Sequence, residues 1–402
     1  MPDTTTSIPT NQIEGPDALA DLVRGCIADR KPIVDYGIAH TGLGHRPPAE
    51  HVKLVQRASG SGVIEHYEQD MTGRVAAGAT IGRVQHALRQ HNQFLPIDAD
   101  DDITIGEVIN HNVYGPLRVA YGSMRDLLLG LHYIDGQGRD IHVGGRTVKN
   151  VAGYDVTKLI VGSLGELGII YEATLRTYAV PTHILAVDLA IDDPATIDNA
   201  LADWLANDAA PATMMLAYQQ GKWLIRLGYY GRPTGCTAQR LALEALFDNV
   251  PAIQITATRN VNLEDELTQT AADRAWRRRS PALVKVIVPP ASTGVVCNAL
   301  AAAVVPNGQT LRLDAMPVHG CIFVGGPLNA TQTAELDHLI NQTIAPIGGQ
   351  RAWYAKPDDA DRIEPIAPRP AAWPMLLKLK RVMDPSGIFN PNRFIPVEDA
   401  PA

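Results

Sequence analysis

The chain has 402 residues, a hydrophobic content of 46% and a formal net charge of −8. A chain of this length can bury a large core, so we expect a globular protein with two or three subdomains. The charge is spread along the chain with no basic run apart from Arg277–Arg279, which argues against nucleic acid as a partner.

Cysteine usage and hydropathy narrow the class of protein further. Cys26, Cys236, Cys297 and Cys321 lie far apart with no CxxC pair, so we expect no iron–sulfur cluster, no zinc site and no bound metal. No apolar run reaches roughly 18 residues, and the polar start has no signal-peptide core. We therefore expect a cytoplasmic protein without direct membrane insertion, in which any membrane association is made through partners. Residues 1–12 are expected to form a flexible tail.

The first 180 residues alternate short elements with glycine-rich loops. In chain order the sequence predicts a strand at 30–37, a strand at 73–79, a helix at 80–92, a helical centre within 93–115, a β-hairpin at 126–145, a short helix after 156 and a strand before 180. The helix at 80–92 places Ile81, Val84, Ala87 and Leu88 on one face, with Thr80 as its cap. A Gly-containing turn between two apolar runs indicates the hairpin.

Residues 181–355 have a different pattern of alternating strands and amphipathic helices. The sequence predicts strands at 183–191, 214–230, 282–290 and 316–326, and helices at 197–208, 237–247, 294–304 and 333–344. This order indicates two related strand–helix–strand halves, which would suit a ferredoxin-like cap over a site. A Pro-rich segment then leads to a final helix and tail.

Three glycine loops carry the first chemical signal. Loops at 37–44, 104–106 and 162–168 would bring backbone N–H groups toward a common point, and such groups bind pyrophosphate. An anionic dinucleotide is therefore a candidate ligand, although each loop taken alone is better explained as a turn. Neither GxGxxG nor GxxxxGK[ST] occurs, so neither a Rossmann site nor a P-loop is indicated.

The segment from 115 to 176 contains, in order, YGS-x-RD, GG, KN-x-x-GYD and GS-x-G-x-LGII. In this combination it resembles the FAD domain of the vanillyl-alcohol-oxidase (PCMH-type) flavoproteins. The resemblance extends to TIGEVINHN at 104–112 and to LKRVMDPSGIFNPNRF at 379–394, and covers roughly half of the chain. Within this family, KNVAGYD is most similar to the smaller FAD-binding subunits of bacterial glycolate oxidases.

The resemblance implies an α+β fold with a two-subdomain PCMH-type FAD-binding domain and a ferredoxin-like α+β cap domain. The FAD-binding domain would span 13–180, with subdomains at about 13–62 and 63–180. The cap or substrate domain would span 181–355. Residues 356–402 would form a C-terminal helix and tail that return to the FAD domain.

The resemblance also assigns residues to noncovalently bound FAD. The first pyrophosphate loop corresponds to Gly37, Ile38, Ala39, His40 and Thr41, and the second to Thr104, Ile105 and Gly106. The next segment corresponds to Asn112, Gly115, Tyr121, Gly122 and Ser123. The rest of the cofactor site corresponds to Gly153, Tyr154, Asp155, Gly162, Gly165, Gly168 and Ile170, of which Ile170 would offer backbone groups to the adenine end. Arg125 and Asp126 would either contact the cofactor or form a buried ion pair.

Two departures from the family pattern concern these loops. Ile38 and Ala39 stand where many relatives carry glycines, and Glu107 stands at the second glycine of their TIGG. A carboxylate beside a diphosphate is repulsive unless it points away or is neutralised. His40 and His45 lie near the loop that could carry a covalent flavin link, but we expect them to be ordinary polar residues.

The resemblance implies an FAD-dependent oxidoreductase subunit that oxidises glycolate or a related 2-hydroxy acid by hydride transfer to flavin N5. Its expected partners are this small acid, a second flavoprotein subunit and an iron–sulfur subunit of a glycolate oxidase-like complex. The alternative is a non-catalytic FAD-binding or scaffolding subunit that assembles with a separate catalytic flavoprotein.

No catalytic residue is assigned from the sequence. Oxidation of a 2-hydroxy acid needs a base for the hydroxyl proton and a cation for the carboxylate. The GH-x-GD-x-N-like motif that catalytic relatives carry in the cap is missing here. His319, in PVHGCIF, is expected to be an ordinary strand residue, and Arg277–Arg279 either bind a carboxylate or form an exposed helix end.

Overall fold

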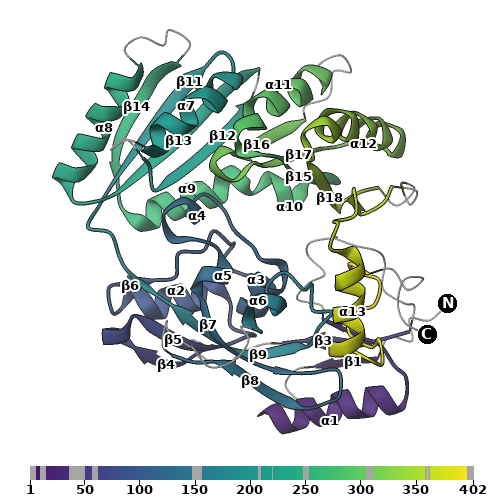
Figure 1. The fold of residues 1–402 in the computed structure, drawn as a ribbon. Helices are drawn as coiled ribbons and strands as arrows, with labels where there is room; N and C mark the ends of the chain where they lie inside the picture. The colour runs from purple at the N-terminus through teal and green to yellow at the C-terminus, as the bar shows by residue number, and fades with distance from the viewer. Residues whose placement is uncertain are drawn as a thin grey trace. The chain divides into compact units, whose positions relative to one another are not determined.

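The chain folds into two compact units (Figure 1). The computed structural model describes residues 6–9, 15–35, 50–56, 62–146, 156–206, 210–219, 221–247, 253–304, 311–357, 360 and 363–395. Unit 1 comprises residues 1–114, 122–180 and 370–402, and unit 2 comprises residues 115–121 and 181–369. The short segment 115–121 therefore belongs to unit 2, although the chain on both sides of it belongs to unit 1.

A three-stranded parallel sheet begins unit 1. Its order is β1-β3-β2, with β1 at Thr6–Pro9, β2 at Ile33–Asp35 and β3 at Val52–Val55. Helix α1, Gly15–Ala28, buries Leu19, Val23 and Cys26 at helical spacing in one cluster with Ile33 and Leu54. The expectation of a flexible tail at 1–12 is wrong for residues 6–9, because the edge of β3 pairs with their backbone groups.

The larger sheet of unit 1 has five antiparallel strands in the order β4-β5-β9-β7-β8. The strands are β4 at Val63–Tyr67, β5 at Thr72–Ala76, β7 at Leu128–Ile134, β8 at Asp140–Gly144 and β9 at Ile169–Arg176. The predicted hairpin is confirmed as β7–β8, in which Gly130 pairs with Gly144 and Ile134 with Asp140. A separate short pair joins β6, Gln93–Phe94, to β10, Tyr178–Ala179.

Helices share one apolar core with this sheet. They are α2 at Ile81–Arg89, α3 at Ile105–His111, α5 at Met124–Leu127 and α6 at Thr157–Ile160. The helix predicted at 80–92 is confirmed, because Ile81, Val84 and Leu88 are buried at helical spacing. Thr80 is the N-cap by position, but its side chain makes no capping hydrogen bond.

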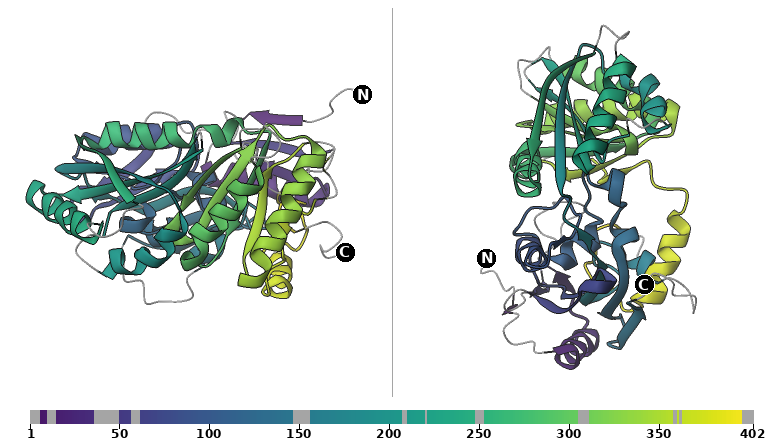
Figure 2. Two further views of the ribbon diagram at one scale, coloured as in Figure 1. Left: turned by 90° about the horizontal axis from the view of Figure 1, so that it is seen from above. Right: turned by 90° about the vertical axis from the view of Figure 1, so that its left-hand side faces the viewer.

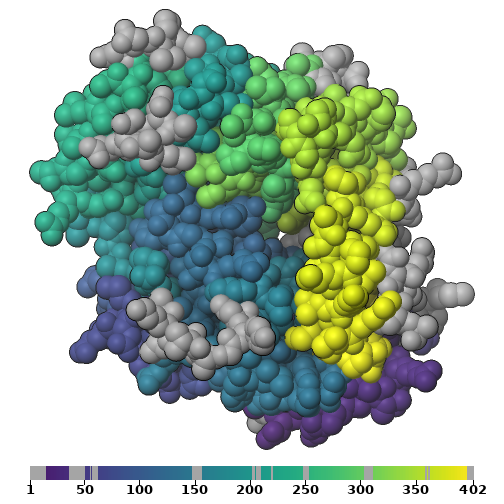
Figure 3. Space-filling view, viewed as in Figure 1, coloured from purple at the N-terminus to yellow at the C-terminus, as the bar shows by residue number. Residues whose placement is uncertain are grey.

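The C-terminal segment completes unit 1. It consists of α13, Trp373–Met383, and the chain that follows. The N–H of Ile33 donates to the Ile388 carbonyl at 2.7 Å, and the N–H of Asn390 donates to the Ile33 carbonyl at 2.9 Å. The outer side of α13 lies at the surface (Figure 3, yellow), where Met375 is 71% and Val382 72% exposed. The end of the chain is therefore attached to β2 near its beginning.

Unit 2 is built on one nine-stranded antiparallel sheet in the order β14-β11-β13-β12-β16-β17-β15-β18-β19. Its strands are β11 at His183–Ile191, β12 at Thr213–Gln219, β13 at Lys222–Gly231, β14 at Ile253–Val261, β15 at Ala282–Ile287, β16 at Arg312–Met316, β17 at Cys321–Gly326, β18 at Gln350–Ala355 and β19 at Ile366–Ala367. The helices are α7 at Ala195–Ala206, α8 at Pro233–Phe247, α9 at Leu263–Arg274, α10 at Trp276–Arg279, α11 at Thr293–Val304 and α12 at Ala330–Ile344. Two successive halves, β11 to β14 and β15 to β18, each have the order β-α-β-β-α-β.

The two faces of this sheet carry different helices (Figures 1 and 2). Helices α7, α8, α11 and α12 contribute to one hydrophobic cluster with the sheet, whereas α9 and α10 lie on the opposite face. The strands and helices predicted between 181 and 355 are present, whereas β14, β16 and β18 were not expected from the sequence. Among the described residues, no helix has both the length and the apolarity needed to cross a membrane.

Candidate cofactor site

The N-terminal ends of α2 and α3 lie side by side, joined by a bridge between their two N-cap residues. The N–H of Ile105 donates to the Ala79 carbonyl at 2.9 Å, and the N–H of Gly106 donates to the Ala77 carbonyl at 2.8 Å. A Cβ on Gly106 would lie 3.3 Å from that same Ala77 oxygen. The segment Thr104–Gly106 is thus an ordered turn, but two of its N–H groups already have acceptors within the protein.

Glu107 is engaged in its own helix. Its carboxylate accepts a hydrogen bond from the Thr104 N–H at 2.6 Å, and the Thr104 hydroxyl accepts one from the Glu107 N–H at 3.2 Å. This capping box neutralises the carboxylate with backbone donors at the positive end of the helix dipole. The T-x-x-E spacing in TIGE was the signal that identifies this role.

The C-terminal end of α3 meets the loop that follows α6. Asn112 ends α3 in the left-handed conformation, with φ of 49°. The N–H of Gly162 donates to a carbonyl of α3 at 2.9 Å, and the N–H of Leu164 donates to the Asn110 carbonyl at 2.9 Å. Gly162 and Gly165 have φ of 82° and 69°, a region that glycine adopts without steric cost. The fold therefore brings together the predicted residues Asn112, Gly162 and Gly165.

Polar side chains at this junction lack partners among the described residues. The buried oxygens are Asn110 Oδ1, Asn112 Oδ1 and Ser163 Oγ. Leaving a buried acceptor unpaired costs about 1–3 kcal/mol, so such atoms are normally paired with protein, water or ligand. FAD carries hydroxyl, imide and amino groups that can donate to them. The residues at this junction therefore fit a polar cofactor, and Asn110 and Ser163 are additions that the sequence did not single out.

Gly168 and Ile170 are positioned by the larger sheet. A Cβ on Gly168 would lie 2.7 Å from the Tyr133 ring and 2.9 Å from the Ile134 carbonyl oxygen, so close packing on β7 requires glycine here. Ile170 pairs with Tyr133 in the β9–β7 ladder, and its side chain is buried in the core. Both residues therefore have structural roles of their own.

Ser123 begins α5 and fixes the acidic residue beside it. The N–H and the hydroxyl of Ser123 both donate to the Asp126 carboxylate, at 2.7 and 2.8 Å. A Cβ on Gly122, which has φ of 82°, would lie 2.8 Å from the same carboxylate. Arg125 and Asp126 are both exposed, so the buried ion pair considered from the sequence is wrong.

The other predicted cofactor residues are distributed differently. Gly115 and Tyr121 belong to unit 2, in a segment that contains α4, Arg118–Tyr121, and packs on β12. The remaining residues lie outside the described residues: Gly37, Ile38, Ala39, His40, Thr41, Gly153, Tyr154 and Asp155.

His319 is not in a strand, and that prediction is wrong. It ends the tight turn η6, Pro317–His319, between β16 and β17, because Pro317 and the left-handed Gly320 interrupt the alternating pattern. Burial, and secondarily the positive charge of Arg118, lowers the pKa of His319 to about 4. The imidazole is therefore neutral at pH 7, near a guanidinium of α4.

The arginines at 277–279 divide into two groups. Arg277 donates to the Asp314 carboxylate at 2.6 Å and lies 3.8 Å from the centroid of the Phe323 ring. With its charge paired in this way, Arg277 is a structural residue rather than an open carboxylate site. Arg279 is exposed and lines a cavity of about 720 Å³ together with Arg312.

Known proteins share these features. Residues 12–144 match the family model for an FAD binding domain. Glycolate oxidase subunit GlcE of Escherichia coli is 24% identical over 382 residues, which cover 94% of this chain and 96% of that protein. The mitochondrial D-lactate dehydrogenase (cytochrome) of Arabidopsis thaliana is 30% identical over 203 residues, 50% of this chain but only 34% of the relative. The solved glucooligosaccharide oxidase of Acremonium strictum superposes with a TM-score of 0.72 at 12% identity, over 95% of this chain and 89% of that structure.

The matched domain and the fold define a flavoprotein-type chain in which an FAD-binding domain is joined to a second α+β unit. The chain belongs to the PCMH-type FAD-binding flavoproteins, the family that its sequence resembles. The relatives are named as oxidases and dehydrogenases, so its class is that of the FAD-linked oxidoreductases.

Proposed function

We propose that the chain binds FAD noncovalently at the junction of α3 with the 162–168 loop, through the residues assigned by the resemblance together with Asn110 and Ser163. The observation that carries this proposal is the set of buried, unpaired side-chain oxygens beside two left-handed glycines. Because the N–H groups of Ile105 and Gly106 are already bonded, this turn would contact FAD by close approach of the chain rather than by free donors.

The proposed domains follow from the same reasoning. Residues 13–180 form the FAD domain, with subdomains at 13–62 and 63–180, and residues 356–402 return to it. The start of β4 at Val63 and the grouping of residues 370–402 with unit 1 support these divisions. Residues 181–355 form the cap, and the repeated β-α-β-β-α-β order supports its ferredoxin-like description.

Noncovalent binding is supported by the cysteines. All four are free and buried, and the one in unit 1, Cys26, lies in the apolar cluster of α1. None presents an accessible thiol for attachment. The solved glucooligosaccharide oxidase, by contrast, carries FAD linked to both cysteine and histidine. The proposal predicts that denaturation releases all the flavin from this chain.

The proposed reaction is the oxidation of glycolate or a related 2-hydroxy acid. FAD, when bound, supplies N5 as the hydride acceptor. His319 is neutral at pH 7 and can accept the hydroxyl proton, while Arg118 can hold the substrate carboxylate by charge-assisted hydrogen bonds. Their proximity within unit 2, in a segment that also carries Gly115 and Tyr121, supports this assignment.

The proposed setting is a multi-subunit complex. Similarity to a glycolate oxidase subunit over nearly the whole of both chains supports assembly with a second flavoprotein and an iron–sulfur subunit. We place the complex in the cytoplasm, with any membrane association made through these partners. The second candidate function is a non-catalytic FAD-binding or scaffolding subunit, which is favoured by the missing GH-x-GD-x-N motif and by the low basicity of His319.

The first experiment tests the cofactor site. The visible spectrum of the purified full-length chain should show flavin, and the flavin released on denaturation should be FAD. Asn112→Gly keeps the left-handed backbone but removes the side-chain oxygen, so the affinity for FAD should fall about 3- to 10-fold. Asn92→Gly is the matched control, because Asn92 has a similar φ of 54° and is exposed elsewhere in unit 1. Equal affinities for the two variants would refute the proposed contact.

The second experiment separates the two candidate functions. Anaerobic addition of glycolate or lactate should bleach the flavin of the wild-type chain, alone or with its purified partner subunits. His319→Gln should slow bleaching with FAD content unchanged, and Arg118→Gln should mainly raise the substrate concentration required. Full FAD loading without bleaching under either condition would favour the scaffolding function instead.

A further inference from the structure

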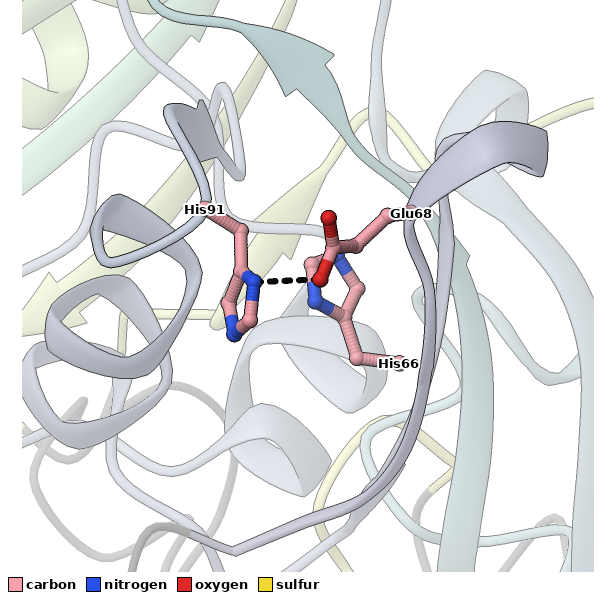
Figure 4. A group of neighbouring side chains, drawn as sticks. All are labelled: His66, Glu68 and His91. Atoms are coloured by element: carbon pink, nitrogen blue, oxygen red, sulfur yellow. Dashed lines mark ion pairs between the residues drawn. The ribbon is translucent and has the colours of Figure 1, made fainter.

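Two histidines and a glutamate from separate segments of unit 1 face one another (Figure 4). His66 lies in β4, Glu68 begins the turn η3, Glu68–Asp70, and His91 follows α2. One ligand-type atom from each side chain lies within 4.8 Å of the other two. The Glu68 carboxylate is paired with His91 Nδ1, and the two imidazole rings are 4.8 Å apart at 71°.

The orientation of His66 is fixed by a buried amide. Gln93 Nε2 donates to the Glu68 carbonyl at 2.9 Å, so Gln93 Oε1 is the atom that faces His66 Nε2, at 3.1 Å. The Thr177 hydroxyl donates to the same oxygen. Because Oε1 is an acceptor, His66 Nε2 carries the hydrogen, and Nδ1 of the neutral ring keeps its lone pair. Metal-binding histidines are oriented in this way by an acceptor on their other ring nitrogen.

The cluster has more acceptors than donors at its centre. His66 Nδ1 and the Glu68 carboxylate both offer lone pairs, while the N–H of His91 supplies a single hydrogen and pairs with Glu68. A cation that replaced this hydrogen would satisfy all three side chains together. Imidazole and carboxylate donors suit borderline transition metals such as zinc or cobalt, whereas magnesium and calcium prefer oxygen donors alone.

We propose that His66, Glu68 and His91 bind one divalent first-row transition metal ion, physiologically zinc. Tetrahedral zinc ligands lie about 3.3 Å apart, so the three donors must close by up to about 1.5 Å. The side chains of His91 and Glu68 are 41% and 54% exposed and can make this movement without disturbing the core. The bound ion would fasten the β4–β5 connection to the turn between α2 and β6.

This site differs from what the sequence led us to expect. The prediction of no metal rested on cysteine spacing, which says nothing about histidine and carboxylate ligands. None of the three residues belongs to the proposed FAD contacts. Occupancy of the metal site and loading of FAD can therefore be measured independently.

The test uses tag-free, full-length protein carrying FAD, stripped of metal with a chelator. Titration with Co²⁺ should give d–d absorption bands that saturate at one ion per chain, and Zn²⁺ should displace the Co²⁺. His66→Ala and His91→Ala should abolish these bands. Glu68→Gln and Gln93→Leu should weaken binding at least about tenfold, the latter through loss of the orienting acceptor. FAD content should be the same in all variants.

His142→Ala is the matched control. His142 is an exposed histidine of unit 1 that lies 3.1 Å from the Asp140 carboxylate, and its removal should leave Co²⁺ binding unchanged. An excess of Mg²⁺ or Ca²⁺ should not displace Co²⁺, and this readout needs no variant. Absence of d–d bands, persistence of the bands in both alanine variants, or displacement by Mg²⁺ would each overturn the proposal.

Discussion

Replacing Glu166 with glutamine should make the stability of unit 1 less sensitive to pH. Glu166 is 2% exposed, and its carboxylate accepts hydrogen bonds from the N–H groups of Phe394 at 2.6 Å and Ile395 at 3.1 Å. Burial raises the pKa of Glu166 to about 7, against the lowering effects of Lys380 and the two N–H groups. This carboxylate therefore links the end of the chain to the 162–168 loop.

The sign of the pH effect follows from the raised pKa. The unfolded chain loses the proton of this carboxyl near its ordinary pKa of 4.5, whereas the folded chain retains it up to about pH 7. The stabilisation is fully present below pH 4.5 and is lost as the pH rises to about 7. One pKa unit corresponds to about 1.4 kcal/mol, so the loss approaches about 3 kcal/mol at pH 8.

Hydrogen exchange of the backbone at 388–395, corrected for intrinsic exchange rates, measures this effect between pH 5 and 8. Glu166→Gln keeps an acceptor oxygen for both N–H groups but carries no charge. Its opening free energy should match the wild type near pH 5 and exceed it by up to about 3 kcal/mol at pH 8. A difference between wild type and variant that stays constant over this range would refute the reasoning.

Asp384→Asn provides the contrasting control. Asp384 is fully buried and accepts hydrogen bonds from the Lys380 ammonium at 2.7 Å and the Phe389 N–H at 2.9 Å. Its neutralisation leaves a buried lysine without its charged partner, which costs about 3–5 kcal/mol. This variant should be destabilised throughout the pH range in which Glu166→Gln shows its gain.

Three further predictions concern single positions. Glu107→Ala should lower the free energy of unfolding by about 1 kcal/mol through loss of the capping box, whereas Glu107→Gln should leave FAD affinity unchanged in a flavin titration. Gly168→Ala should cost about 1–3 kcal/mol in urea unfolding because its Cβ meets the Tyr133 ring, while Gly145→Ala, with no atom within 4 Å, should cost nothing. Arg118→Gln should raise the pKa of His319 above about 4, as followed by the NMR shift of its ring proton, because a nearby positive charge is removed.

Local sequence patterns were sufficient for many elements of the fold. The spacing of Ile81, Val84 and Leu88 predicted α2, because helical periodicity and burial coincide there. The turn between two apolar runs predicted the β7–β8 hairpin. Strand β14 was missed, because this edge strand is largely exposed and lacks an apolar face. His319 was misplaced, because a proline and a left-handed glycine break an apolar run that otherwise reads as one strand.

The sequence by itself determined the cofactor class, since the combination YGS-x-RD, KN-x-x-GYD and GS-x-G-x-LGII requires only the order of residues along the chain. The roles of individual charged and polar groups were decided by the tertiary structure. Glu107 caps α3, Arg277 is paired with Asp314, and Asn112 meets Gly162 across a long separation in sequence. The His66, Glu68 and His91 cluster arises in the same way, because the charge, burial and hydrogen bonding of a side chain depend on neighbours that only folding brings together.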